Sequence, residues 1–160
     1  MVPKLHAPPE VQLLVNTVMS WAEGQLKTEG HIPAAAAWLP RNSSEPGFRT
    51  LDGPAELSIA QQASLLAREL EAPWRRNELS AILLAAPVLY GRKGSAERKE
   101  AVRLHVEAVG EAHGEDIGTY CADILMPYRI RAAGRGRSGT RNRVHFSHPV
   151  AQESDSFISL

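Results

Sequence analysis

The sequence has few of the residues on which cofactor chemistry and membrane insertion depend. Cys121 is the only cysteine among 160 residues, which excludes an intrachain disulfide and a metal cluster built from several thiolates. No apolar run approaches the roughly 18–20 residues that a helix needs to span a bilayer. The start of the chain, MVPKLHAPPEV, has no apolar segment after a basic one, as a secretory signal would. We therefore expect a cytoplasmic protein without membrane contact.

An excess of charge is also missing, because 18 basic residues balance 18 acidic ones. No global field therefore recruits nucleic acid or an anionic membrane surface. A chain of this length and ordinary composition is the size of one domain. We expect a flexible arm over residues 1–9, a single domain over residues 10–150 and a tail over residues 151–160.

The familiar catalytic motifs are absent as well. The sequence contains no Gly-x-Ser-x-Gly elbow, no P-loop and no Gly-x-Gly-x-x-Gly after a strand. His145 and His148 are separated by two residues rather than the one of the His-x-His-Pro signature of zinc-dependent deubiquitinases, so an extended strand sends them to opposite faces. We expect both histidines to be exposed, and we predict neither a metal site nor a cofactor.

Two amphipathic helices are present. The first is expected from Glu10 to a C-terminal stop at Gly30, on the three- and four-residue spacing of its apolar positions. The second begins at a capping box in which Ser58 precedes Gln61 by three residues, and it should end at Pro73.

The longest apolar run, Leu79 to Tyr90, could be a buried helix or a buried strand on periodicity alone. Pro87 decides in favour of the strand, because within a helix it would remove a hydrogen bond and clash at a cost of about 3 kcal/mol. We expect residues 79–86 to be buried on both faces, with a distortion at Pro87. Residues 32–39 and 48–51 on either side of a turn predict a β-hairpin.

Residues 101–109 alternate cleanly between apolar and polar side chains, which predicts a half-buried antiparallel strand. A further strand is expected over residues 117–128, where Pro127 should limit it to an edge position or mark its end. A short last strand is expected over residues 144–146. The resulting order, α-β-β-α-β-β-β-β, favours an α+β two-layer sandwich in which both helices lie on one face of a mostly antiparallel sheet.

This layout resembles a family of small uncharacterised bacterial proteins. The features that carry the resemblance are Trp21-Ala22 in the first helix, Gly30 with Pro33, Glu107 in an extended strand and the Pro127-Tyr128 pair. The resemblance covers roughly residues 15–150 and implies a fold outline and a bacterial source, without an activity. The chain departs from the pattern in its Arg/Gly insertion after Tyr128, where a tight turn would be expected.

The polar face of the strand over residues 101–109 is a candidate surface site. Arg103, His105 and Glu107 point to one side of it, and His105 with Glu107 could act as a general acid and base. A cytidine-deaminase zinc site also contains His-x-Glu, but it requires two further cysteines that the chain lacks. Cys121 as a nucleophile would need His105 on an adjacent strand. We expect these polar residues to form a solvated sheet face and Cys121 to be a small buried or half-buried residue.

An Arg/Gly segment, residues 129–143, is the most distinctive remaining feature. Its six arginines could contact phosphates: Arg129, Arg131, Arg135, Arg137, Arg141 and Arg143. The neutral overall charge and the absence of aromatics between Arg135 and Arg143 favour a solvated loop instead.

These observations support three functional hypotheses. The first is a non-catalytic binding or interaction module that binds another protein or itself, as a homodimer for example. The second is a nucleic-acid-associated protein that acts through the Arg/Gly segment. The third is an enzyme that uses His105 and Glu107, and the sequence offers the least for it because no catalytic motif accompanies them.

Overall fold

The computed structural model describes residues 7–51, 57–91, 94, 96–109, 119–131 and 143–152. Two helices are found in these ranges, α1 (Pro9–Thr28) and α2 (Ile59–Arg75). The strands are β1 (Ala35–Pro40), β2 (Gly47–Thr50), β3 (Leu79–Tyr90), β4 (Lys99–Val109), β5 (Thr119–Arg131), β6 (Arg143–Phe146) and β7 (Val150–Gln152). No described helix is long and apolar enough to cross a membrane.

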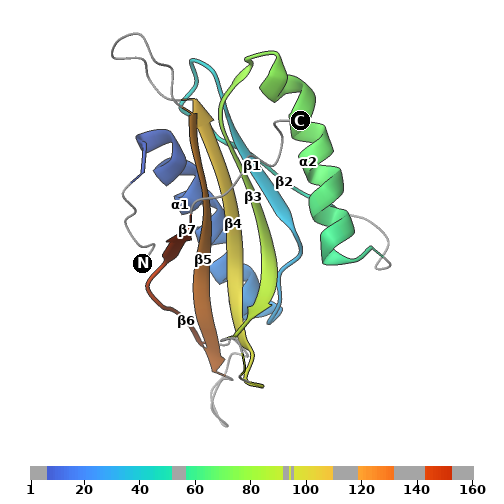
Figure 1. Ribbon diagram of the computed structural model, residues 1–160, viewed down its shortest axis with the longest axis vertical. Helices are drawn as coiled ribbons and strands as arrows, with labels where there is room; N and C mark the ends of the chain where they lie inside the picture. Colours follow the sequence, from blue (N-terminus) through green and yellow to red (C-terminus); the bar gives the residue numbers. More distant parts are fainter. Residues whose placement is uncertain are drawn as a thin grey trace.

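The strands form one antiparallel sheet in the order β2-β1-β3-β4-β5-β6, with β7 pairing a separate part of β5 (Figure 1). The predicted α+β class and antiparallel sheet are confirmed, as is the β1–β2 hairpin. The strand β7 was not predicted. It spans the position at which we expected the domain to end, because its last two residues lie beyond residue 150.

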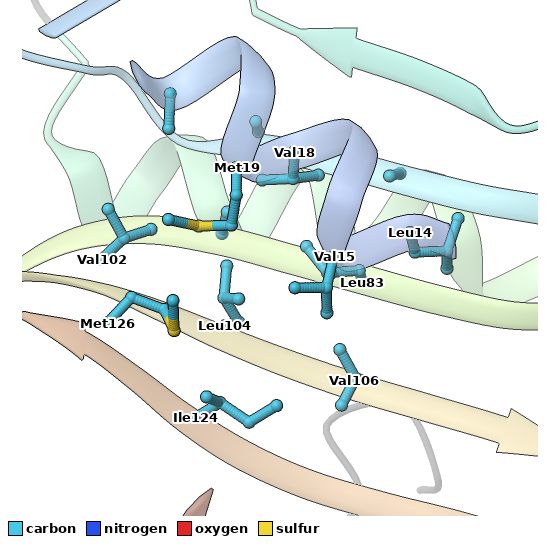
Figure 2. Close-up of a cluster of buried hydrophobic side chains, with 14 of the residues drawn as sticks. Leu14, Val15, Val18, Met19, Leu83, Val102, Leu104, Val106, Ile124 and Met126 are labelled. Atoms are coloured by element: carbon cyan, nitrogen blue, oxygen red, sulfur yellow. The ribbon is translucent and has the colours of Figure 1, made fainter. Parts of the chain in front are cut away.

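Helix α1 covers one face of the sheet. Its apolar side chains are buried against alternate residues of the central strands, as Figure 2 shows for Leu14, Val15, Val18 and Met19 above Leu83, Val102, Leu104, Val106, Ile124 and Met126. Pro9 begins the helix, where its missing N–H needs no partner. Gly30 has a φ of +77° just beyond the helix, a left-handed conformation that glycine adopts without strain. This layer is the main core of the protein.

Helix α2 lies on the opposite face of the sheet, so the prediction that both helices share one face is wrong (Figure 1). Its buried Leu66 and Leu70 pack with Ile82 and Leu84 of β3, which alternate with the Leu83 that faces α1. The physical reason lies in β3, whose residues 79–85 are buried with the single exception of Ser80. A strand that is apolar on both faces requires a covering layer on each of them.

Helix α2 also extends past Pro73, at which we expected it to end. The predicted capping box is present at its start, where the Gln61 N–H donates to Ser58 Oγ and the Ser58 N–H donates to Gln61 Oε1. Pro73 lies in the last turn, so its missing N–H removes one hydrogen bond only. The helix stops at Arg75, and Asn77 then adopts a φ of +60°.

Of the three prolines in the described strands, Pro40 ends β1, and Pro87 and Pro127 are accommodated where a neighbouring strand is absent. Pro87 keeps a regular pairing with Val102, without the distortion that we expected, and it lies beyond the last β3 residue paired with β1. Pro127 lies in the gap between the part of β5 that pairs with β7 and the part that pairs with β6. The prediction of an edge position is therefore wrong, because β5 is flanked on both sides.

The core under α1 predicts that two leucines of neighbouring strands contribute very differently to the free energy of unfolding. Leu104 is fully buried, and Leu104→Ala should lower the free energy of unfolding by about 2–5 kcal/mol. Leu89 is 67% exposed, and Leu89→Ala should change it by no more than about 0.5 kcal/mol. Urea denaturation monitored by circular dichroism measures both, and equal effects would contradict the packing described here.

Candidate functional site

The pairing of β4 with β5 gathers polar side chains on the face of the sheet opposite α1. His105 lies directly across from Asp123, and Glu107 lies directly across from Cys121. Arg103 is two residues before His105, so strand alternation places it on the same face. The three predicted site residues are thus brought together with Cys121, which the sequence connected to His105 only as a possible nucleophile, and with Asp123, which it did not connect to them.

Three direct contacts join this group into a chain. Arg103 Nη2 lies 2.9 Å from Asp123 Oδ2, and the other oxygen of Asp123, Oδ1, lies 3.0 Å from His105 Nδ1. His105 Nε2 lies 3.1 Å from Glu107 Oε2. Each distance is that of a well-formed hydrogen bond between charged or polar groups. We call these four residues the polar chain.

The inner end of the polar chain is buried, contrary to our expectation of a solvated sheet face. His105 and Glu107 are each only 3% exposed, whereas the Arg103 side chain is 45% exposed. The neighbouring residues of β3 explain part of this, because Ile82 and Leu84 pair with Glu107 and His105 and belong to the apolar cluster under α2. Among the described residues, no buried side-chain nitrogen or oxygen lacks a hydrogen-bond partner.

The two nitrogens of His105 both face carboxylates, Asp123 at Nδ1 and Glu107 at Nε2. A neutral imidazole carries one N–H and therefore donates to only one of them. The second contact requires a further proton or another positive charge between nitrogen and oxygen. Burial is the largest single influence on Asp123 and raises its pKa, but the hydrogen bonds and charges of Arg103 and His105 together hold that pKa below its ordinary value.

A cavity of about 660 Å³ lies beside the polar chain, between α2 and the sheet. Its walls are residues 84–88 of β3 and seven residues of α2: Ile59, Ala60, Ala63, Ser64, Ala67, Arg68 and Glu71. Arg103 and His105 of β4 complete the lining, while Glu107 is not part of it. The volume falls within the range of small-molecule binding sites.

The sizes of the side chains on α2 explain this cavity. Leu66, Leu70 and Trp74 pack against the sheet in the apolar cluster on this face. The residues of α2 that line the cavity include Ala60, Ala63 and Ala67, whose side chains end at Cβ and leave space above β3. Ala63 belongs to the apolar stripe that packs against the cluster on this face. Its small size was the signal for a cavity, and the stripe alone did not reveal it.

The arginine-rich segment is only partly described. Arg129 and Arg131 are exposed at the end of β5, and Arg143 is exposed at the start of β6. The other three, Arg135, Arg137 and Arg141, lie outside the described residues. His145 and His148 are exposed, as predicted.

Comparison of the chain with protein-family models, with curated proteins and with solved structures finds no match. The function must therefore be argued from the cavity and the polar chain.

The buried end of the polar chain predicts a large effect of Glu107→Ala on stability. Removal of this carboxylate takes away the contact of the buried His105 Nε2 with Glu107, and we expect the free energy of unfolding to fall by about 3 kcal/mol or more. Glu69→Ala is the matched control, because it breaks an exposed ion pair with Arg49 and should cost at most about 1 kcal/mol. Urea denaturation of both variants checks this, and a loss for Glu107→Ala as small as that of the control would show that the buried contact is not stabilising.

Proposed function

We propose that this protein is a non-catalytic binding module for a small molecule that combines an apolar body with a carboxylate or similar anionic head. The observation that carries the proposal is the cavity of about 660 Å³, which Arg103 and His105 line on the β4 side and mostly apolar side chains line elsewhere, with Ser64, Arg68 and Glu71 of α2 as its other polar residues. Pockets of this kind bind ligands through apolar area and fix their orientation through a few polar groups.

The apolar part of the cavity is suited to a hydrocarbon or aromatic body. Ala63 and Ala67 of α2 face Leu84, Ala86 and the neighbouring residues of β3 across it. These side chains offer no hydrogen bonds, so a ligand group placed between them would be stabilised by removal of its apolar surface from water, at about 25 cal/mol per Å². The ligand body therefore lies along α2 in this proposal.

Arg103 is suited to receive the anionic head. One of its guanidinium nitrogens binds Asp123, and the other N–H groups have no partner among the described residues. A guanidinium offers several N–H groups in a planar fork that matches a carboxylate. Asp123 holds the Arg103 side chain in place, which reduces the entropy lost when a ligand binds.

The same geometry gives less support to an enzyme that uses His105 and Glu107. Glu107 does not line the cavity, and both nitrogens of His105 already contact carboxylates of the protein. A general base must bring a nitrogen or oxygen within hydrogen-bond reach of the reacting proton. Binding without catalysis is therefore the function that the site supports best.

A pair of ligands with the same body tests the recognition of the head group. Octanoate should bind the protein more tightly than octan-1-ol, and Arg103→Gln should weaken octanoate binding by about 10- to 100-fold, which corresponds to about 1.5–3 kcal/mol for a charge-assisted hydrogen bond. Isothermal titration calorimetry, or the shifts of amide signals of β3 and α2 in nuclear magnetic resonance spectra, measures both affinities.

Two further variants control this experiment. Arg49→Gln removes an exposed arginine of β2 that does not line the cavity, and it should leave octanoate binding unchanged. Ala67→Phe should fill the cavity and weaken both ligands. If octanoate binds no better than octan-1-ol, or binds equally well to the Ala67→Phe variant, the proposal is wrong.

A second candidate, contact with nucleic-acid phosphates, is favoured by one observation at the β5–β6 pair. Arg131 lies directly across from Arg143, and Arg129 lies directly across from His145, with all four residues exposed. Like charges opposite each other destabilise a sheet unless an anion lies between them. A polyanion would supply that charge.

Labelled RNA and DNA test this second candidate at low salt. The triple variant Arg129→Gln, Arg131→Gln and Arg143→Gln should bind more weakly, and its affinity should depend less steeply on salt concentration. Fluorescence anisotropy gives both quantities. Binding that is absent from the unmodified protein, or unchanged in the triple variant, would exclude these arginines as phosphate contacts.

A further inference from the structure

We propose that His105, Glu107 and Cys121 form a binding site for one divalent transition-metal ion of the zinc class. One ligand atom from each residue, an imidazole nitrogen, a carboxylate oxygen and the sulfur, lies within 4.8 Å of the other two. This site goes beyond the binding function proposed above, because Glu107 and Cys121 do not line the cavity.

The donor set selects the class of metal. Imidazole, carboxylate and thiolate together are the ligands of Zn²⁺, whereas calcium and magnesium take oxygen ligands. Bond lengths of about 2.0–2.3 Å in a tetrahedral site place two ligand atoms about 3.3–3.8 Å apart. His105 Nε2 and Glu107 Oε2 are 3.1 Å apart, so small side-chain rotations bring these atoms and the Cys121 sulfur to such distances.

The backbone holds the three side chains on rigid elements. His105 and Glu107 are two residues apart on one face of β4, and Cys121 is the direct partner of Glu107 on β5. Strand β4 is paired on both sides, and β5 is paired with β4 along residues 119–127. A site built on paired strands is positioned more accurately than one built on loops.

The surroundings of His105 are those of a metal ligand. A histidine that binds a metal through one nitrogen usually donates its other N–H to a carboxylate, which fixes the orientation of the ring. Asp123 fills this role at Nδ1, at 3.0 Å, and Arg103 holds Asp123 in turn. Nε2 is the nitrogen that faces Glu107 and the proposed ion.

The charges of the cluster balance when such an ion is bound. The Glu107 carboxylate and the Cys121 thiolate together carry two negative charges, which a divalent cation neutralises. Arg103 and Asp123 neutralise each other. The ion also supplies the positive charge that the contact between His105 Nε2 and Glu107 Oε2 requires. Three protein ligands leave one tetrahedral position for water or another small ligand.

Cobalt(II) titration of the reduced, full-length protein tests this site directly. We expect one ion per chain, with the intense visible bands of a tetrahedral cobalt site and a near-ultraviolet charge-transfer band from thiolate to cobalt. Cys121 is the only cysteine in the chain, so this band reports its coordination without any mutation. Zinc should displace the cobalt and abolish the spectrum. The absence of a thiolate band at saturating cobalt would overturn the proposal.

Variants then test each residue by competition with a zinc chelator. Cys121→Ser and Glu107→Gln should weaken zinc binding by at least about tenfold, and Asp123→Asn should weaken it by about 10- to 100-fold because the amide replaces the negative charge that faces His105 Nδ1. His148→Ala, at an exposed histidine, should bind as the unmodified protein does. Binding that survives Cys121→Ser, or that is lost in His148→Ala, contradicts the assignment.

Two measurements keep the outcome interpretable. Circular dichroism shows whether each variant is folded. If a variant does not fold, the cobalt spectrum of the unmodified protein still shows whether Cys121 binds the metal. Octanoate titration of Cys121→Ser separates the two proposals, because this variant should retain cavity binding while it loses the metal. Loss of octanoate binding by the Arg103→Gln variant tests the cavity proposal only. The metal proposal is decided by the thiolate-to-cobalt band.

Discussion

The hydrogen-bond register of β4 between β3 and β5 is the constraint on which the rest of the structure depends. It buries Val102, Leu104 and Val106 under α1, and the same alternation places the polar residues between them on the opposite face. A slip of one residue would exchange the two faces, with charged groups under α1 and leucine beside the cavity. The apolar core therefore fixes the register, and the register positions the polar chain.

The two faces of the sheet are closed in different ways. Helix α1 places large side chains over the centre of the sheet and leaves a well-packed core (Figure 2). Helix α2 has large side chains at Leu66, Leu70 and Trp74, but small ones at Ala63 and Ala67, so it lies against β3 without filling the space beside it. A change of side-chain size along one helix is sufficient to turn a covering layer into the wall of a cavity.

The sequence predicts local features of this fold better than the relations between its elements. The capping box at Ser58 and the alternation around Leu104 depend on neighbours in the chain, and both are confirmed. The side on which α2 packs depends on which faces of β1 and β3 remain uncovered, and the contact of Asp123 with His105 depends on the register of two strands. Alternation marks a residue as polar and outward-facing, but a second layer can still bury it, as it does for His105.

Burial of the inner end of the polar chain costs free energy, because charged and polar groups lose their contact with water. Apolar residues of similar size in place of a buried ion pair often stabilise a protein by about 1–4 kcal/mol, so stability alone does not account for Glu107 and His105. The proposals above assign these residues a role in holding charge at a fixed place. Arg103 is half exposed at the cavity and His105 is buried, and Asp123 joins them through contacts of 2.9 and 3.0 Å. Asp123 therefore connects an arginine that reaches the cavity with a histidine that belongs to the buried cluster.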